Sequence, residues 1–412
     1  MIILTLNCRF CNESLINIFA DLGASPLSNA FLTKEMLSNL EKIYPLCAYV
    51  CDNCFLVQLP EFEKPENIFS DYAYFSSFSS SWLKHAKDYV DMIIPTLLLD
   101  ERSLVVEIAS NDGYLLQNFT AKKIPVLGIE PAKNIAITAI KKNISTLTEF
   151  FNSKLANHLV NEGKTADLII GNNVLAHVPS LNDFVIGLKI LLKSNGVITL
   201  ELPHLLQLIQ NNQFDTIYHE HFSYFSLITL KKIFYFHNLK IFDVEEIHTH
   251  GGSLRIFVTH LENESIGITN KVNLLLEKEN EFGLDQISGY SEFNNSLNKI
   301  KLQLREFLIN AKKESKKVVG YGAAAKGNTL LNFCEIRTDL LEYVVDRSEY
   351  KQGLYLPGTH IPIKSPDEIQ KTKPDYLVII PWNLKDEIME QMKYIRSWGG
   401  KFVIPIPEVK IL

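Results

Sequence analysis

The ten residues "IYHEHFSYFS" at 217–226 place two imidazoles, a carboxylate and a phenol within four consecutive positions. Such groups could move protons, because an unperturbed histidine titrates close to neutral pH. His219 and His221 could instead ligate a divalent ion together with Glu220, although histidines two residues apart share a face only in an extended strand. A polar loop with aromatic packing is the third interpretation. Features in the rest of the chain are needed to choose among these three interpretations.

A second chemically marked group lies near the start of the chain. Cys8 and Cys11 form one Cys-x-x-Cys pair, and Cys51 and Cys54 form another. Each pair offers two thiolates from a tight turn, and four thiolates make a tetrahedral zinc site. Because all four positions would be filled by protein, the metal is expected to be structural. Cys47 is expected to be a small buried apolar residue outside this set.

Acidic side chains end two strands predicted in the middle of the chain. "SLVVEIAS" (103–110) carries Glu107, and "PVLGIEPA" (125–132) carries Glu130. In a doubly wound sheet such strand ends meet at the crevice where ligands bind. The intervening loop lacks G-x-G-x-x-G, which disfavours a pyrophosphate. A cofactor with a ribose and a positive charge suits acidic residues better, and S-adenosylmethionine fits that description.

Loop and strand-end amides complete the expected cofactor site. Asn111 and Gly113 lie in the turn after the first strand, and Asn111 together with Asp112 could bond the methionine portion. Asn172 and Asn173 end a third strand, "ADLIIGNNVLAHV" (166–178), and are expected near the sulfonium. An ordinary strand–turn–helix with a surface carboxylate is the competing interpretation of the first loop.

A glycine-rich loop near the C-terminus offers a different cofactor. In "GYGAAAKGN" (320–328) three glycines follow a predicted strand and open a helix, and Asp346 ends the next strand. Taken alone, this pattern predicts dinucleotide binding and an NAD-dependent oxidoreductase. The spacing is G-x-G-x-x-x-x-G, however, and Lys326 stands where a nucleoside diphosphate would need a cation. The competing interpretation of Lys326 is a surface lysine.

The elements that must position these groups fall into three blocks, 1–68, 69–245 and 246–412. The last two alternate short apolar strands with helices, which predicts an α/β protein with parallel sheets behind a small cysteine-rich domain. The 412 residues are 46% hydrophobic and 21% charged, with net charge −6, so they favour a folded enzyme and disfavour a nucleic-acid partner. No run reaches the roughly 18 apolar residues of a membrane span, and the start lacks a signal peptide, so a cytoplasmic location is expected.

The whole chain resembles the nucleotide-sugar C-methyltransferases, which methylate C3 of a 4-keto deoxysugar nucleotide. The matching stretches occur in family order: "DLGASPLSNAF", "YAYFSSFSSSW", "EIASNDGYLL", "GIEPAKNIA", "NNVLAHV", "FDTIYHEHFSYFS", "HGGSLR", "GYGAAAKGNTLLN" and "PGTHIPI". The resemblance implies an N-terminal zinc-binding domain, a central Rossmann-like methyltransferase domain and a C-terminal Rossmann-like domain. It also implies S-adenosylmethionine as cofactor and structural zinc. Methyl transfer to oxygen or nitrogen, and a non-catalytic scaffold with the same fold, are the weaker alternatives.

By this resemblance the "YHEH" motif is the acid/base apparatus. Removing the C3 proton next to a carbonyl gives an enolate, which requires a base and a donor to the enolate oxygen. His221 is expected to be the base, and Tyr218 to hydrogen-bond the enolate or relay the proton. Glu220 would orient a histidine or bind a sugar hydroxyl, and His177 would help to hold the keto group. His219 is expected to be structural.

The resemblance also assigns residues to the sugar nucleotide. Tyr72 would close over the sugar, with Tyr74 as its rival. Lys326 and Asn328 would bind the nucleotide from the C-terminal domain, with Arg255 of "HGGSLR" near them. The expected partner is thus a nucleoside-diphosphate 4-keto sugar, and the expected assembly is a monomer or a weak homodimer.

Overall fold

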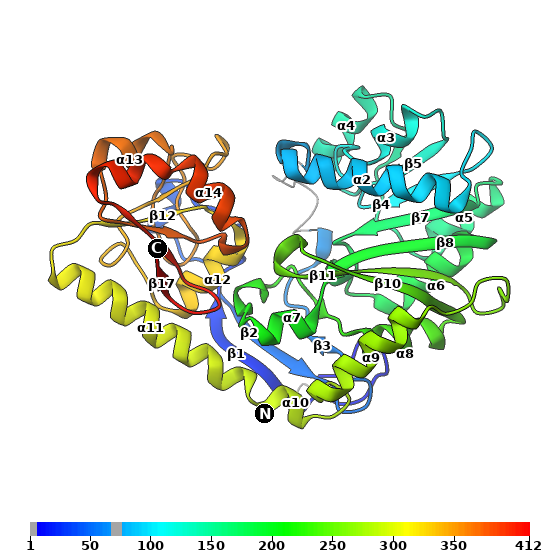
Figure 1. Cartoon of the computed structure of the whole chain (residues 1–412), viewed down its shortest axis with the longest axis horizontal. Coiled ribbons are helices and arrows are strands. Elements are labelled where there is room, and N and C mark those ends of the chain that lie inside the picture. Colours follow the sequence, from blue (N-terminus) through cyan, green and yellow to red (C-terminus); the bar gives the residue numbers. More distant parts are fainter. Residues whose placement is uncertain (1–5, 67–75) are drawn as a thin grey trace.

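The computed structural model of the chain describes residues 6–66 and 76–412, so Tyr72 and Tyr74 lie outside the described residues. Three sheets organise the described chain (Figure 1). They confirm the predicted α/β class, with a small N-terminal cysteine-rich domain, a central Rossmann-like domain and a C-terminal α/β domain. No helix of the described part is long and apolar enough to cross a bilayer.

The N-terminal sheet has four strands and is antiparallel, and its last strand comes from far along the chain. Its order is β1 (Asn17–Ser25), β2 (Tyr44–Val50), β3 (Val57–Gln58) and β9 (Ser223–Tyr224). Because β9 follows the "YHEH" motif directly, the N-terminal domain helps to form the region that carries that motif.

The central sheet has seven strands. Its order is β10 (Leu239–Ile247), β11 (Ser253–His260), β8 (Leu192–Pro203), β7 (Ala166–Asn172), β4 (Val105–Ile108), β5 (Val126–Ile129) and β6 (Thr146–Leu147). β4 pairs in parallel with β5 on one side and β7 on the other, so the chain changes direction across the sheet at β4. The carboxyl ends of these strands therefore flank the crevice of a doubly wound sheet. β11 pairs antiparallel with β8, so this sheet continues beyond the boundary expected at residue 245.

Helices cover both faces of the central sheet, as its buried strands require. Helix α2 buries Ala86, Tyr89, Val90 and Ile93, a spacing that forms one apolar face. The Ser79 side chain caps its start by accepting from the amide of Trp82 at 3.2 Å. The helices of this domain are α2 (Ser80–Leu97), α3 (Leu116–Thr120), α4 (Lys133–Lys141), α5 (Ser153–Asn161), α6 (Leu181–Leu191), α7 (Leu205–Gln210) and α8 (Leu227–Phe236).

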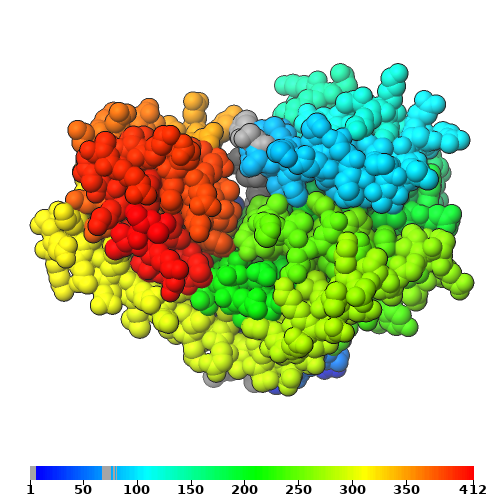
Figure 2. Space-filling model, in the orientation of Figure 1, coloured from blue at the N-terminus to red at the C-terminus, as the bar shows by residue number. Residues whose placement is uncertain are grey.

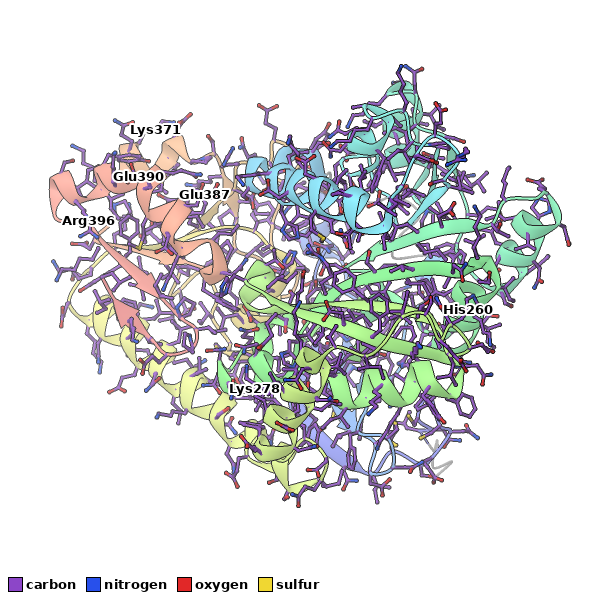
Figure 3. The ribbon with its side chains drawn as sticks, turned by 45° about the vertical axis from the view of Figure 1, so that its right-hand side comes forward. His260, Lys278, Lys371, Glu387, Glu390 and Arg396 are labelled. Atoms are coloured by element: carbon purple, nitrogen blue, oxygen red, sulfur yellow. The ribbon has the colours of Figure 1, made fainter. Side chains whose placement is uncertain are left out.

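The C-terminal domain has a six-stranded sheet whose order is β14 (Ile363–Lys364), β13 (Val344–Val345), β12 (Val318–Tyr321), β15 (Tyr376–Ile379), β16 (Lys401–Ile404) and β17 (Lys410–Ile411). Its helices are α12 (Ala325–Phe333), α13 (Asp367–Thr372) and α14 (Lys385–Gln391). Lys371, Glu390 and Arg396 lie among the charged side chains on the outer surface of this domain (Figure 3). A furrow separates this domain from the central one in the space-filling view (Figure 2).

Three helices connect the central and C-terminal domains, namely α9 (Asn270–Phe282), α10 (Ser288–Ser291) and α11 (Phe293–Lys313). Glu279 on α9 is fully buried and accepts three hydrogen bonds. Its donors are Nε2 of His204 at 2.7 Å and the amides of Leu227 at 2.7 Å and Ile228 at 2.8 Å. One carboxylate thus fixes the turn after β8 and the first turn of α8.

The segment from Gln213 to Ser226, here called the bridging segment, contacts all three domains. Its Phe222 carbonyl accepts from the amide of Leu59 at 3.0 Å, and its Phe222 amide donates to the carbonyl of Ala176 at 2.7 Å. From the C-terminal domain, the Thr329 hydroxyl donates to the Ile217 carbonyl at 3.0 Å. The "YHEH" motif is therefore held where the three domains meet.

Candidate functional site

The four predicted zinc ligands come together in the N-terminal domain. The sulfur atoms of Cys8, Cys11, Cys51 and Cys54 all lie within 4.8 Å of one another. Two of the contacts, Cys8 to Cys54 at 3.5 Å and Cys11 to Cys51 at 3.4 Å, are close to the roughly 3.8 Å expected between thiolates on tetrahedral zinc. Cys47 lies outside this group and is half-buried rather than fully buried.

Local backbone geometry explains why each Cys-x-x-Cys pair converges. Asn12 and Phe55, one residue after each pair, adopt φ of 64° and 65°. Each turn is closed by an amide that bonds back to the first cysteine's carbonyl, from Asn12 to Cys8 at 2.9 Å and from Phe55 to Cys51 at 3.0 Å. Two matched turns thus present four thiolates to one point, and the donor set fits zinc. Within the described ranges this is the only cluster of histidine, cysteine or acidic side chains that could hold a metal, so the metal interpretation of "HEH" fails.

The predicted cofactor loop lies at the carboxyl end of β4. Glu107 is 1% exposed, and neither carboxylate oxygen has a hydrogen-bond partner among the described residues. Burial, followed by the charges of Glu130 and Asp112, raises the pKa of Glu107 well above its usual value. A buried carboxylate without a partner is costly, so this one is suited to bind a ligand. The positive φ of Asn111 (49°) and Gly113 (77°) turns the backbone around it.

Glu130 supports the same loop from the end of β5. Its oxygens accept from the amides of Asn111 and Ala132, both at 2.9 Å. Burial raises the pKa of Glu130 as well, while these two amides oppose the shift. The acidic pocket matches the ribose and the positive charge of S-adenosylmethionine, so the residues present fit this cofactor.

Asn172 and Asn173 end β7 beside this loop. Asn172 pairs in register with Glu201 on β8. The Asn173 amide donates to the Glu201 carbonyl at 2.7 Å, and its side-chain oxygen is buried without a partner among the described residues. The expected strand-end amides therefore do lie at the edge of the sheet that also presents Glu107.

The bridging segment turns two side chains of the "YHEH" motif toward each other. The Tyr218 hydroxyl lies 2.9 Å from Nε2 of His221, and Nδ1 of His221 lies 2.8 Å from the Thr216 carbonyl. A carbonyl can only accept, so the proton is on Nδ1, and Nε2 accepts from Tyr218. Burial holds the pKa of His221 well below its usual value, so the imidazole is neutral at neutral pH. Its Nε2 is thus a base.

The other members of the motif, His219 and Glu220, have hydrogen-bond partners in the N-terminal domain. Nε2 of His219 lies 3.1 Å from the Pro45 carbonyl, and the ring packs against Tyr44 and Phe62, away from His221. The Glu220 carboxylate accepts from the Asn29 amide at 2.6 Å. It is the Glu220 main-chain carbonyl, not its carboxylate, that accepts from Nδ1 of a histidine, namely His177.

His177 stands next to His221. The distance from its Nδ1 to the Glu220 carbonyl oxygen is 2.8 Å, and its ring centroid lies 4.7 Å from that of His221. Burial lowers the pKa of His177 to about 4. Two neutral imidazoles and a phenol therefore form one compact group beside the end of β7.

The C-terminal domain contributes Lys326 from the start of α12. Its ammonium donates to Asn383 at 2.8 Å and lies 4.7 Å from the centroid of the Trp382 ring. Burial lowers the pKa of Lys326, while Asp215 of the bridging segment opposes that shift. Asn328, also named by the sequence, donates to the Ser28 carbonyl, and its side-chain oxygen is buried without a partner in the described ranges.

Arg255 occupies a different place from the one expected. It lies on β11, is 5% exposed, and donates from Nε to Glu201 at 2.9 Å and from Nη1 to Glu245 at 2.8 Å. Its guanidinium is thus engaged inside the central sheet rather than beside Lys326. The contact with Glu201 could not be foreseen from the sequence, because β8 and β11 are far apart along the chain.

The glycine loop of the C-terminal domain is explained by internal packing. A Cβ on Gly322 would lie 2.5 Å from Pro381, and one on Gly327 would lie 2.5 Å from Ile380. Asp346, which follows the next strand β13, accepts from the amides of Ala323 and Ser348, both at 2.8 Å. These contacts weigh against the dinucleotide interpretation.

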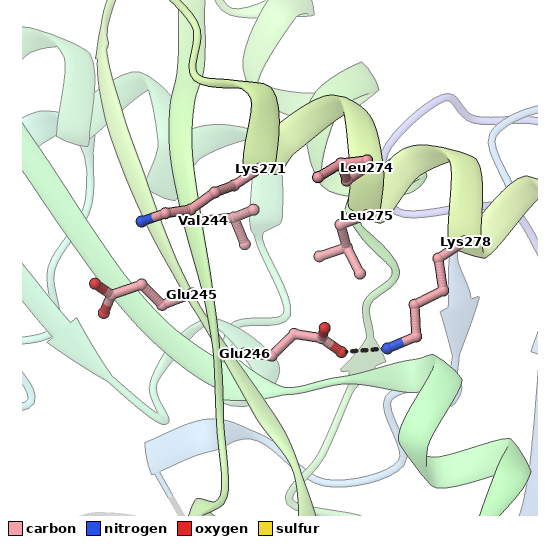
Figure 4. Close-up of a pocket in the computed structure, with 7 residues that line it drawn as sticks. All are labelled: Val244, Glu245, Glu246, Lys271, Leu274, Leu275 and Lys278. Atoms are coloured by element: carbon pink, nitrogen blue, oxygen red, sulfur yellow. Dashed lines mark hydrogen bonds and ion pairs between the residues drawn. The ribbon is translucent and has the colours of Figure 1, made fainter.

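A separate hollow of about 440 Å³ lies between β10 and α9 (Figure 4). Its Lys278 pairs with Glu246 at 2.6 Å, and its Lys271 pairs with Asp243 at 3.2 Å. Both lysines are neutralised by neighbouring carboxylates, so we assign no charged ligand to this surface.

Comparison with known proteins agrees with this arrangement. Three family models match in succession: "Putative zinc binding domain" at residues 8–69, "Methyltransferase domain" at 82–244 and "C-methyltransferase C-terminal domain" at 248–407. The C-methyltransferase NovU of Streptomyces niveus is 33% identical over 405 residues, which cover 98% of this chain and 96% of that protein.

Solved structures resemble only part of the chain. Magnesium protoporphyrin IX methyltransferase (ChlM) from Synechocystis PCC 6803 with bound SAM is 14% identical, with a TM-score of 0.36, covering 49% of this chain and 100% of that one. A SAM-dependent methyltransferase from Anabaena variabilis is 17% identical, with a TM-score of 0.35, covering 49% and 99%. These likenesses are too slight to carry an argument. The NovU match over nearly the whole of both chains is decisive, and the chain belongs to the C-methyltransferase family as an S-adenosylmethionine-dependent C-methyltransferase with a four-cysteine zinc-binding domain.

Proposed function

We propose that the protein methylates C3 of a 4-keto deoxysugar carried on a nucleoside diphosphate. The observation that carries this proposal is the hydrogen bond between the Tyr218 hydroxyl and Nε2 of the buried, neutral His221. Carbon becomes nucleophilic only when a proton is removed, and a proton next to a carbonyl is the one such a base can take. A 4-keto sugar presents that proton at C3.

In this mechanism the C3 proton passes to Nε2 of His221 by way of the Tyr218 hydroxyl. The Thr216 carbonyl keeps the other ring proton on Nδ1 and stabilises the imidazolium that forms. His177 stands beside the pair as a neutral ring and adds no charge that would oppose this protonation. The electron pair of the C3–H bond moves onto the C4 oxygen as an enolate.

Bound S-adenosylmethionine supplies the electrophilic methyl group. On the side of the site that would hold this cofactor, the chain contributes the buried carboxylate of Glu107. Glu130, Asn111 and Gly113 shape the loop around it. The strand-end amides Asn172 and Asn173, which lie beside Glu201 at the end of β7, would line the same side of the site. Excluding water around the sulfonium and the enolate protects both from side reactions.

The sugar nucleotide would extend from this point into the C-terminal domain. Lys326 provides a cation for the diphosphate, and Asn328 provides a buried amide close to it on α12. Both side chains come from the glycine-rich segment whose glycines are needed for internal packing.

The experiment that tests the function uses a panel of 4-keto deoxysugar nucleotides in D₂O. We expect the protein alone to wash out the C3 proton, and the protein with S-adenosylmethionine to give a product methylated at C3, both observed by proton NMR. Exchange at C3 without the cofactor separates proton removal from methyl transfer. If every 4-keto nucleotide keeps its C3 proton, the proposed substrate class is wrong.

A further inference from the structure

An enolate needs a hydrogen-bond donor at its oxygen, and the "YHEH" group offers bases instead. The Nδ1 protons of His221 and His177 are both directed at main-chain carbonyls. The Tyr218 hydroxyl donates to His221. These three protons are therefore committed, and the nitrogen atoms that remain are acceptors. The donor to the C4 oxygen has to come from another part of the site.

His250 is placed to be that donor. It lies in the turn η5 (Thr249–Gly251) between β10 and β11, and its φ of 55° is unusual for a residue other than glycine. Its Nε2 lies 3.2 Å from Nδ2 of Asn173. As that amide is oriented, Asn173 donates to Nε2, which places the imidazole proton on Nδ1. The His250 side chain is exposed to solvent.

Neighbouring parts of the protein hold this turn in its strained conformation. Gln213 of the bridging segment donates to the Gly251 carbonyl at 2.7 Å. Trp382 of the C-terminal domain packs so closely that a Cβ on Gly251 would lie 2.5 Å from its ring. The Trp82 ring meets the His250 ring edge-on, with centroids 5.3 Å apart. Backbone strain that is fixed from several sides is typical of functional positions.

Neighbouring charged and titratable side chains act on the pKa of His250 and on that of His221. The charge of Lys326 lowers the pKa of both His250 and His221, and a charge on His250 would lower that of His221. Desolvation is the larger cause for His250, and its pKa falls to about 4. The ring is consequently neutral at neutral pH and donates as an imidazole, without placing a second cation beside the base.

We propose that Nδ1–H of His250 donates a hydrogen bond to the C4 oxygen of the sugar and stabilises the enolate, opposite the Tyr218–His221 pair. This inference rests on the proposed function. The C3–H bond breaks, its proton goes to Nε2 of His221 through Tyr218, and its electron pair moves to the oxygen held by His250. A bound sulfonium would supply the methyl group, with its S–CH₃ bond broken as the C3–CH₃ bond forms, and His250 would release the C4 oxygen as a carbonyl.

Two variants of His250 distinguish the effect of its hydrogen-bond donor from the effect of its aromatic ring. His250→Phe keeps an aromatic ring against Trp82 and removes the donor. His250→Asn tolerates the left-handed backbone and keeps an amide N–H close to the position of Nδ1. His248→Phe, at an exposed position of the same connection, is the matched control. Each protein is assayed for C3 exchange in D₂O, for methyl transfer, and for S-adenosylmethionine affinity by calorimetry.

We expect His250→Phe to slow both exchange and methyl transfer by about 10²–10³, the usual effect of removing one oxyanion donor, with cofactor affinity unchanged. His250→Asn should recover to within about tenfold of the unmodified protein, on the same scale. Exchange by His250→Phe at the unmodified rate would overturn the role of His250 while leaving the proposed function intact. An unmodified protein that exchanges no 4-keto nucleotide would overturn both.

Discussion

Replacing Glu279 tests whether α9 positions the turn after β8 and the start of α8. The Glu279 carboxylate is fully buried and accepts from His204, Leu227 and Ile228. Glu279→Leu fills a similar volume and leaves three buried donors without partners. Because α8 begins directly after the bridging segment, loosening its first turn should also disturb the positions of Tyr218 and His221.

The magnitude follows from the number of orphaned donors. Each buried donor left unpaired costs about 1–3 kcal/mol, so the loss of all three partners in Glu279→Leu should lower the free energy of unfolding of this region by about 3–9 kcal/mol. Glu279→Gln retains Oε1, which serves both His204 and Leu227, and disturbs only the bond from Ile228. Its cost should therefore be that of one donor, about 1–3 kcal/mol.

Amide hydrogen exchange, measured by mass spectrometry on the zinc-loaded protein, reports the loss of stability separately for each peptide of the chain. Peptides covering 226–236 should exchange much faster in Glu279→Leu and slightly faster in Glu279→Gln, with denaturation midpoints in the same order. Glu277→Leu, at an exposed position of the same helix, is the control and should change neither measurement. Unchanged protection of the first turn of α8 in Glu279→Leu would refute the bracing role of this carboxylate.

Three further predictions concern the metal and the base. Cys51→Ala should lower both the zinc content, measured by elemental analysis, and the melting temperature. Cys47→Ala, outside the cluster, should leave the metal in place. A zinc-free Cys51→Ala protein of unchanged stability would contradict a structural metal. Tyr218→Phe and His221→Asn should each slow C3 exchange by about 10²–10⁴ with unchanged calorimetric affinity for S-adenosylmethionine; normal exchange would remove that residue from the proton path. Burial holds the pKa of His221 below its usual value, so its neutral form persists as the pH falls, and the exchange rate should be flat from about pH 8 to about pH 6; an acid limb centred near about pH 6.5 would refute this.

The sequence was informative where a function depends on residues close together in the chain. Two Cys-x-x-Cys pairs predict a metal site because the turn between each pair is local, and the four sulfur atoms do converge. Apolar strands that end in Glu107 and Glu130 predict a sheet edge, since parallel strands place their carboxyl ends together. The expected separation of His219 from His221 also agrees with their different hydrogen-bond partners.

Contacts between distant segments could not be predicted in the same way. The resemblance placed Arg255 near the substrate, yet its partners Glu201 and Glu245 are set by strand order in the sheet. Glu279 looks like an ordinary polar position on a helix until the helix is packed against α8. The turn that carries His250 depends on Trp382, a residue more than a hundred positions away.

The position of β9 in the N-terminal sheet bears on how this enzyme can be recombined with its relatives. β3 pairs with β9, His219 bonds the Pro45 carbonyl, and Glu220 bonds Asn29. A chimera that exchanged only the residues before the methyltransferase domain would separate these partners. This holds even though its junction would lie at a domain boundary of the sequence. The N-terminal domain and the bridging segment therefore form one structural unit made of two separate stretches of sequence. A hybrid enzyme should fold only when both stretches come from the same parent protein.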